Sequence, residues 1–328
     1  PAVYVMKKVV ITGGTGSLGL ALTRYLLTNK LVERLVVFSR DEQKQARMHA
    51  SYADGPTELR FLLGDVRDRE ALLHAFHGCD TVIHCAALKR VDLIACQPIE
   101  VKKTNVDGTQ NVLEAALQAG IEKVLLVSTD KAVMPENMYG ATKMLAELLT
   151  THFNAIGYPR GLKSSVVRFG NLWGSHGSVV ELWQEAAVLG DALRVTDRRM
   201  TRFVMTMAEA CAFIVRAITD MDGGEIFVPS QLSAMRLIDL ATVIGGSIVE
   251  IGLRPGGEKL HERLLSDDEP KRALRQPTRF LITPSHRTWS DSVYHGWDID
   301  ETLHYSSDQG PFVSQQNLAL LIKEEPER

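Results

Sequence analysis

Tyr139 and Lys143 are residues whose types and spacing could support chemistry. They lie four residues apart in a segment with helical periodicity, so both side chains are expected on one helix face. A lysine ammonium beside a phenol lowers the phenol's pKa, which is otherwise about 10, and the tyrosine could then take a proton from a substrate hydroxyl. Tyr4 and Lys8 repeat the spacing where no chemistry is expected. The hydroxyl pair Ser128-Thr129, which precedes Tyr139, favours a functional interpretation.

A glycine-rich turn near the start of the chain predicts a dinucleotide site. It lies between an apolar run at 9–11 and a helical segment at 18–28. Gly13 allows a tight turn, Gly16 removes a side chain where backbone meets a pyrophosphate, and Gly19 lets helix and strand pack closely. The helix N-terminus offers N–H groups and a positive dipole end to the anion. A plain tight turn is the alternative, and the position between strand and helix favours the dinucleotide.

These groups need a scaffold, and the pattern of the chain predicts one. Apolar runs rich in branched residues alternate with segments of helical periodicity. The runs lie at 9–11, 35–38, 59–63, 81–84, 124–127 and 165–168, and the helical segments at 18–28, 69–76, 106–119, 138–156 and 207–219. Short buried strands alternating with helices predict a parallel sheet covered on both faces. We therefore predict an α/β protein with a doubly wound parallel sheet.

The pattern loosens after Phe169, where several glycines break the alternation. We predict a dinucleotide-binding domain from 6–170 and 201–227, with a strand at 225–228 near its end. A smaller substrate lobe is expected from 171–200 and 228–285, followed by a C-terminal tail from 286–328. Residues 1–5 are expected to lie outside the fold.

The end of the second predicted strand bears on the choice of cofactor. Arg40 lies 21 positions beyond Gly19, where the ribose of the adenine half is expected. An acid at this place suits the 2′-hydroxyl of NAD, whereas an arginine suits the 2′-phosphate of NADP. NADP is therefore favoured over NAD, and a solvated charge cluster with Asp41 is the alternative. After the third strand, Asp65 is placed either to reach the adenine or to cap a helix.

Composition excludes several classes of protein. The 37 Lys and Arg against 40 Asp and Glu give a net charge of −3, so no basic field is available for nucleic acid. No apolar run approaches the ~20 residues of a membrane span, and we expect a cytoplasmic protein without a membrane partner. The four cysteines form no C-x-x-C pair, and His74 and His77 lack further ligands, so no metal is expected.

The chain resembles the extended short-chain dehydrogenase/reductases, which have a Rossmann fold, through its glycine turn, Ser128-Thr129 and the Tyr139/Lys143 pair. More narrowly, it resembles the inverting UDP-N-acetylglucosamine 4,6-dehydratases of bacterial polysaccharide and flagellin-sugar pathways. The motifs that carry this resemblance are Ser39-Arg40-Asp41-Glu42, Gly64-Asp65-Val66-Arg67-Asp68, Ala86-Ala87-Leu88-Lys89, Thr104-Asn105, Ser128-Thr129-Asp130-Lys131-Ala132, Asn137-Met138-Tyr139-Gly140-Ala141-Thr142-Lys143, Arg168-Phe169-Gly170-Asn171 and Met200-Thr201-Arg202-Phe203.

The resemblance implies a role for each member of the catalytic set. Retaining sugar-nucleotide dehydratases have an Asp-Glu pair where this chain has Asp130-Lys131. Lys131 is implied to take the C5 proton, Asp130 to protonate the leaving C6 oxygen, and Thr129 to hydrogen-bond the 4-hydroxyl, beside Tyr139 and Lys143. These roles require a depressed pKa at Lys131 and a raised pKa at Asp130. An adjacent solvated ion pair is the alternative.

The implied reaction is cyclic in electrons. Hydride leaves C4, water leaves across C5 and C6, and hydride returns to C6, so NADP is expected to stay bound. The expected cofactor contacts are Gly13, Thr15, Gly16, Ser17, Leu18, Gly19, Ser39, Arg40, Lys44, Asp65, Val66, Ala86, Ala87, Lys89, Tyr139 and Lys143. The expected contacts to UDP-N-acetylglucosamine or a related UDP-sugar are Lys89, Asn171, Ser178, Val179, Thr201, Arg202, Arg254 and Glu258.

Departures from the family pattern and competing functions remain open. Gly256-Gly257 replaces a single glycine, and His176 and Glu181 stand where the family usually has Arg and Pro, so the nucleotide pocket is expected to be altered. A UDP-sugar 5,6-dehydratase, a UDP-hexose 4-epimerase and a catalytically silent NADP-binding regulator are the alternatives. The outer faces of the helices at 106–119 and 138–156 could pair two subunits, and we expect a homo-oligomer. Trp173 and Trp183 could stack on uracil or belong to the core.

Overall fold

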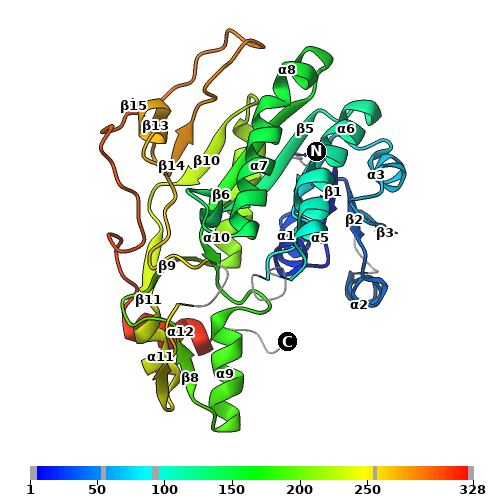
Figure 1. The fold of residues 1–328 in the computed structure, drawn as a ribbon. Coiled ribbons are helices and arrows are strands. Elements are labelled where there is room, and N and C mark those ends of the chain that lie inside the picture. Colours follow the sequence, from blue (N-terminus) through cyan, green and yellow to red (C-terminus); the bar gives the residue numbers. More distant parts are fainter. Residues whose placement is uncertain (1–5, 53–56, 91–95, 254–256, 324–328) are drawn as a thin grey trace.

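The computed structural model describes residues 6–52, 57–90, 96–253 and 257–323 (Figure 1). Among them, ten strands form one sheet in the order β15-β13-β14-β10-β6-β5-β4-β1-β2-β3. The strands are β1 (Lys8–Thr12), β2 (Arg34–Ser39), β3 (Glu58–Leu63), β4 (Thr81–His84), β5 (Lys123–Thr129), β6 (Lys163–Phe169), β10 (Ile226–Pro229), β13 (Ala273–Gln276), β14 (Arg279–Ile282) and β15 (Trp297–Asp298). From β3 across to β10 the neighbouring strands run parallel, which confirms the doubly wound α/β fold.

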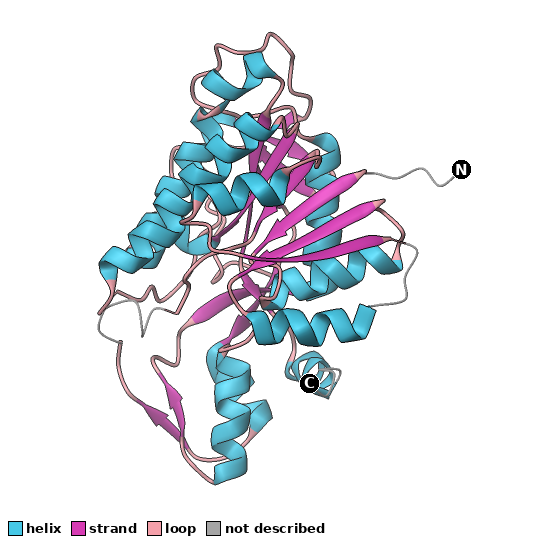
Figure 2. Cartoon of the chain, turned by 90° about the vertical axis from the view of Figure 1, so that its right-hand side faces the viewer, coloured by secondary structure: helices cyan, strands magenta, loops and turns pink. Residues whose placement is uncertain are grey.

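Helices cover both faces of the sheet, as Figures 1 and 2 show. They are α1 (Ser17–Thr28), α2 (Glu42–Tyr52), α3 (Arg69–Phe76), α5 (Pro98–Lys102), α6 (Gly108–Ala119), α7 (Met138–His152), α8 (Asn154–Gly157) and α10 (Met207–Asp220). One face packs against α1 and α10, and the other against α3, α6 and α7. The branched residues of β1 show why, since Val9 and Ile11 are buried in one apolar cluster and Val10 in the other. A strand buried on both faces needs apolar residues at every position.

A smaller lobe lies below the sheet in Figure 1. Its elements are β7 (Asn171–Leu172), α9 (Val179–Leu189), β8 (Leu193–Val195), β9 (Thr201–Met205), β11 (Ser233–Arg236), α11 (Leu237–Ile244), β12 (Ile248–Glu250) and α12 (Gln315–Lys323). The strands pair as β11-β9-β7 and β12-β8. Trp173, Trp183, Leu193, Leu240 and Leu318 belong to the apolar core of this lobe. The lobe therefore has a core of its own, separate from the two sheet faces.

Several segments lie where the sequence pattern did not place them. β13 and β14, which we assigned to the lobe, continue the main sheet next to β10, while β9 pairs inside the lobe. α12, from the expected tail, packs on α11. The predicted helix at 106–119 begins inside a π-helical turn at Lys103–Asp107, and the one at 138–156 divides into α7 and α8. Periodicity reports burial along one element and does not tell which layer buries it.

No helix among the described residues is long and apolar enough to cross a membrane. We predicted that residues 1–5 lie outside the fold, and these residues are not among those that the structure describes.

Candidate active site

A cavity of about 1300 Å³ lies between the end of the sheet and the smaller lobe. The parallel strands deliver their C-terminal ends to it, which is where open α/β sheets bind ligands. All of the predicted site residues line this cavity except three. Asp130 is fully buried beneath its wall, Thr201 lies behind the wall, and Arg254 lies outside the described residues.

The glycine turn has the shape that a dinucleotide needs. Gly13 has a φ of +68°, and a Cβ there would lie 2.8 Å from the backbone nitrogen of Ala86. A Cβ on Gly19 would lie 2.5 Å from the carbonyl oxygen of Gly13. Gly16, the N-cap residue of α1, offers no side chain to the first turn of the helix, so backbone N–H groups face the cavity. The chain is therefore built to bring bare backbone against a pyrophosphate.

The end of the cavity next to β2 and β3 carries a cluster of charges. Arg40 Nη1 lies 3.3 Å from Asp65 Oδ2, and Arg67 Nη2 lies 2.7 Å from the same oxygen. Partial burial raises the pKa of Asp65, but Arg67 and Arg40 outweigh this effect and the pKa is lowered overall. Asp68, not Asp65, caps α3 by accepting from the backbone N–H groups of its first turn. The cap alternative for Asp65 is therefore wrong.

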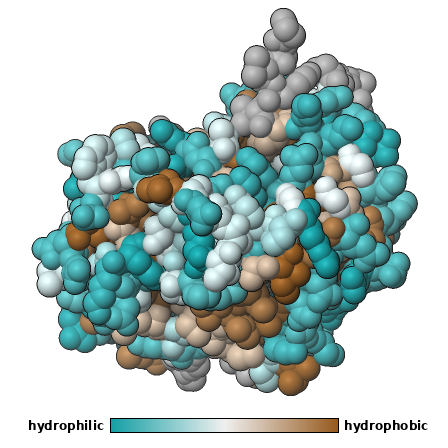
Figure 3. All heavy atoms as spheres, turned by 90° about the horizontal axis from the view of Figure 1, so that it is seen from above, coloured by the Kyte–Doolittle hydropathy of each residue, from teal (hydrophilic) through white to brown (hydrophobic). Residues whose placement is uncertain are grey.

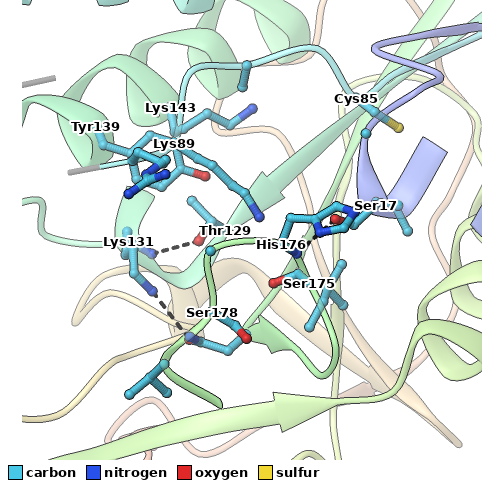
Figure 4. Close-up of a pocket in the computed structure, with 18 of the residues that line it drawn as sticks. Ser17, Cys85, Lys89, Thr129, Lys131, Tyr139, Lys143, Ser175, His176 and Ser178 are labelled. Atoms are coloured by element: carbon cyan, nitrogen blue, oxygen red, sulfur yellow. Dashed lines mark hydrogen bonds between the residues drawn. The ribbon is translucent and has the colours of Figure 1, made fainter. Parts of the chain in front are cut away.

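Thr129, Asp130 and Lys131 form a hydrogen-bonded set at the end of β5. Figure 4 shows Thr129 and Lys131 where they line the cavity. Thr129 Oγ1 donates to Asp130 Oδ1 at 2.9 Å, and Lys131 Nζ donates to the same oxygen at 2.9 Å. Asp130 Oδ2 is buried and has no hydrogen-bond partner among the described residues. Burial is the main cause that raises the pKa of Asp130, and it outweighs the opposing effect of Lys131. A raised pKa is what a proton donor at this place needs.

Lys131 does not meet the sequence-based expectation of a depressed pKa. Burial lowers its pKa, but the carboxylates of Asp130 and Glu262 outweigh burial and raise it overall. The ammonium has three acceptors within reach: Asp130 Oδ1 at 2.9 Å, Asn171 Oδ1 at 3.4 Å and Glu262 Oε1 at 3.5 Å. The solvated-pair alternative is also wrong, because the side chain of Asp130 is fully buried and that of Lys131 is 23% exposed.

The Tyr139 side chain lies in the same cavity, on α7. Asn137 caps this helix by accepting from the backbone N–H of Gly140 at 2.9 Å. The cap fixes the start of α7 and so places Tyr139 in its first turn. Burial raises the pKa of Tyr139 to about 12, and Lys131 opposes that increase, with a hydrogen bond from Thr129 adding to the opposition.

Lys143 does not act on Tyr139 in the expected way. Its Nζ donates to the carbonyl oxygen of Val127 at 2.7 Å, and burial lowers the pKa of Lys143 to about 8. The expectation that Lys143 depresses the pKa of Tyr139 is therefore not met, since the opposing cation is Lys131. Figure 4 shows Tyr139, Lys143 and Lys89 around the same part of the cavity.

Glu262 is a site residue that sequence reasoning missed. Its side chain is 3% exposed, and its Oε1 lies 3.5 Å from Lys131 Nζ. It also lies 3.9 Å from Arg202 Nε through Oε1, and 3.7 Å from Lys259 Nζ through Oε2. The only signal in the sequence was its place five residues beyond the glycine pair Gly256-Gly257, in a stretch where we assigned Glu258 to the site instead.

The predicted substrate residues divide into those on the cavity and those behind it. Asn171, Ser178, Val179, Arg202 and Glu258 line it. Thr201 instead bonds His261 Nδ1 at 2.8 Å and Ser307 Oγ at 2.7 Å, and so supports the wall.

Arg202 is held within the wall. Its Nη1 donates to the carbonyl oxygens of Thr201 and Leu260, and its Nη2 lies 3.5 Å from Glu258 Oε1. Only 7% of its side chain is exposed. The guanidinium therefore faces its carboxylate neighbours more than the open cavity.

Three further features bear on the substrate side. Trp173 donates to the carbonyl oxygen of Leu321 and is buried in the lobe core, whereas Trp183 is buried in that core and also lines the cavity. The backbone N–H of His176 donates to Ser17 Oγ at 3.0 Å, so the lobe touches the glycine turn (Figure 4). No group of three metal-binding side chains occurs in the described part of the chain.

Comparisons with known proteins agree with this geometry. The profile of the family described as "Polysaccharide biosynthesis protein" matches residues 9–284. The inverting UDP-N-acetylglucosamine 4,6-dehydratase of Campylobacter jejuni subsp. jejuni serotype O:2 is 37% identical over 328 residues, covering 96% of this chain and 97% of its own. UDP-glucose 4-epimerase of Rickettsia prowazekii is 37% identical over 278 residues, covering 82% and 81%. The X-ray structure of Pen from Bacillus thuringiensis is 33% identical and superposes with a TM-score of 0.88 over 98% of both chains.

Proposed function

Because this chain belongs to the polysaccharide biosynthesis protein family, we propose that it is a C5-inverting 4,6-dehydratase of UDP-N-acetylglucosamine or a closely related UDP-sugar. The observation that carries the proposal is the set Thr129, Asp130 and Lys131, which meets Tyr139 at one end of the cavity. An acid, a base and an alcohol-binding tyrosine are the groups that this elimination requires. The product is a UDP-4-keto-6-deoxy sugar, and the enzyme is a hydro-lyase.

The residues of the chain divide the proton transfers among them. Tyr139 accepts the proton of the 4-hydroxyl as a phenolate, which requires that its pKa fall below the value of about 12 that burial gives it. Thr129 orients that hydroxyl from the end of β5. Lys131 takes the C5 proton, and Asp130 gives its proton to the departing C6 oxygen, so that water leaves. The acid role suits Asp130, whose pKa is raised mainly by burial. For the base role, Lys131 must pass a proton to Asp130 across the 2.9 Å that separates them.

The glycine turn and the strand ends around it fit a nicotinamide dinucleotide. When bound, this group supplies a hydride acceptor that returns the same hydride within one turnover. We propose NADP rather than NAD, because Arg40 lines the cavity with its side chain 53% exposed and available to a 2′-phosphate. We further propose that the cofactor stays bound between turnovers, since Ser17 in the turn is in contact with His176 of the lobe.

A UDP-hexose 4-epimerase is the second candidate, favoured by the 37% identity to the Rickettsia prowazekii protein. An epimerase needs neither an acid for the C6 oxygen nor a base for C5. The buried Asp130-Lys131 pair would then have no task, which favours the dehydratase. A 5,6-dehydratase uses the same acid and base but returns hydride to C4. A silent regulator would have no use for this catalytic set.

One incubation separates these functions. Purified protein is mixed with UDP-N-acetylglucosamine without added reductant, and the product is followed by mass spectrometry and proton NMR. The 4,6-dehydratase gives loss of one water, a new methyl doublet and a C4 keto or hydrate signature, with the C5 coupling reporting inversion. Loss of water with alkene protons and no methyl indicates 5,6-dehydration. An unchanged mass with an inverted C4 indicates the epimerase.

We also propose that the protein is a homo-oligomer that pairs through α7. Its outer face exposes Met144, Leu145 and Leu148, at 39%, 43% and 47%. Figure 3 shows apolar residues in several places on a face that is otherwise mostly hydrophilic. Exposed apolar patches of this kind mark association sites. Light scattering should give a dimer or larger species, and Leu148→Glu should lower its mass.

A further inference from the structure

We propose that Glu262 is a positioning residue that sets the pH range in which the Asp130–Lys131 pair works as acid and base. The inference rests on the proposed dehydratase function and deepens it. In this proposal Glu262 touches no reacting atom. It acts through Lys131, because Glu262 Oε1 lies 3.5 Å from Lys131 Nζ.

The backbone of Glu262 is held in place by hydrogen bonds to Ser307, and its carboxylate is buried. The backbone N–H of Glu262 donates to Ser307 Oγ at 2.9 Å, and its carbonyl oxygen accepts from the backbone N–H of Ser307 at 2.9 Å. Leu264, two residues on, donates to the carbonyl oxygen of Tyr305. The side chain is buried, and Oε2 has no hydrogen-bond partner among the described residues. A carboxylate fixed in this way is a permanent local charge rather than a surface group.

Charged and titratable groups face Glu262 from every side of this wall. Lys131 and Asp130 come from the turn after β5, Arg202 from β9, and Lys259 from its own segment, three residues away. The further groups that act on these are Glu258, Glu136, Tyr139 and Lys89. Six of the ionisable groups form linked ion pairs, three carboxyls (Asp130, Glu258, Glu262) with three cations (Lys131, Arg202, Lys259).

The charge of Glu262 acts on both members of the catalytic pair in the same direction. It favours the Lys131 ammonium, and it opposes a second negative charge on Asp130. The pair is active when it shares a single proton, which lies on Asp130 while Lys131 is a neutral amine. Such a pair gives a bell-shaped pH profile whose two limbs belong to the pair as a whole. A neighbouring carboxylate therefore moves both limbs to higher pH.

The test is the pH profile of turnover, measured on the purified full chain with its cofactor and UDP-N-acetylglucosamine. In Glu262→Gln the carboxylate is gone, and both limbs should move to lower pH by about one unit or more. Glu262→Asp keeps the charge and should restore the limbs toward their wild-type positions. Lys259→Met removes a cation that faces the same groups, so both limbs should move to higher pH.

Glu269→Gln is the matched control. This buried glutamate pairs with Arg168 at 2.8 Å, away from Lys131, so its loss should lower stability and leave both limbs in place. The inference would be overturned if the pH profile of Glu262→Gln had its two limbs at the same pH values as the wild type, whatever the maximal turnover rate. If Glu262→Gln does not fold, a pH profile of Lys259→Met with both limbs unshifted would overturn the inference instead. Wild-type protein that dehydrates no UDP-hexose would instead overturn the proposed function.

Discussion

Arg40 Nη1 lies 3.3 Å from Asp65 Oδ2, which joins the ends of β2 and β3 at the adenine side of the cavity. The side chain of Arg40 is half exposed, whereas Asp65 is also held by Arg67. A phosphate that bound Arg40 would take it away from Asp65, but the Asp65 carboxylate would keep its ion pair with Arg67. Under the proposed NADP specificity, Arg40 would contact the 2′-phosphate and Arg67 would hold Asp65 in place.

Arg40→Ala should weaken NADP about tenfold or more while changing NAD much less, because a charge-assisted hydrogen bond to phosphate contributes about 1.5–3 kcal/mol. The measurement is a titration of cofactor-stripped protein with each dinucleotide. Arg67→Ala is the matched control: Arg67 contacts the same Asp65 but does not line the cavity, so the ratio of the two affinities should not move. An equal loss for NADP and NAD in Arg40→Ala would show that Arg40 does not read the phosphate.

Lys131→Ala should retain bound cofactor and lose dehydration by about 10²–10⁴-fold, the usual contribution of a positioned base. Deuterium incorporation at C5 in heavy water should be lost with it, because Lys131 is the proposed base for the C5 proton. Lys123→Ala serves as the control for loss of a lysine, because Lys123 begins β5 whereas Lys131 lies in the turn that follows the end of the strand. C5 exchange that survives in Lys131→Ala would remove Lys131 from the base role.

Gly257→Ala should reduce both stability and activity. Gly257 has a φ of +88°, and a Cβ there would collide with the carbonyl oxygen of Glu136. The carbonyl oxygen of Gly257 accepts from Asn137 Nδ2 at 2.9 Å, and Asn137 caps the helix that carries Tyr139. Gly190→Ala is the control, because Gly190 also has a positive φ, +75°, but opens onto empty space. It should cost only the ~1–2 kcal/mol of the backbone conformation, with turnover retained.

Gly257→Ala should cost more than its control and also lower turnover. Urea unfolding gives the stability, and the dehydration rate at saturating substrate gives the activity. Equal losses in the two variants would mean that the close approach to Glu136 has no consequence for Tyr139.

Stability should fall with acid through the buried pairing of Arg168 with Glu147 and Glu269. Burial raises the pKa of Glu269, but Arg168 outweighs it, so the pKa is lowered overall. A carboxyl with a depressed folded-state pKa stabilises the protein above its unfolded pKa of ~4.3, and this contribution is lost as pH falls through the folded value. Glu269→Gln should lower the free energy of unfolding at pH 7 by about 3 kcal/mol.

The same variant should flatten the dependence of stability on acid. Urea titrations at pH 7 and at successively lower pH test this. A difference in the free energy of unfolding between wild type and variant that stays constant with pH would contradict it. The expected difference is largest at pH 7 and shrinks toward low pH, where Glu269 of the wild type is protonated as well.

The sequence predicted those parts of the site that are local. Gly13, Thr129 and Tyr139 each lie at the end of a strand or the start of a helix, and parallel strands bring such ends together. The position of Glu262 was not predictable, because it depends on how the lobe folds back onto β5. The direction of the Lys143 ammonium, toward Val127, was hidden for the same reason: i, i+4 spacing fixes a helix face and not the partner.

The main sheet takes strands from both ends of the chain. β10 pairs with β6, and β14, β13 and β15 follow it, so the sheet is completed only by residues 226–298. During synthesis, the first two thirds of the chain can fold into six parallel strands whose β6 edge is unpaired. An open, apolar strand edge is a template for association with other chains. Nascent chains of this protein should therefore need protection by a chaperone until the strands that cover β6 have left the ribosome.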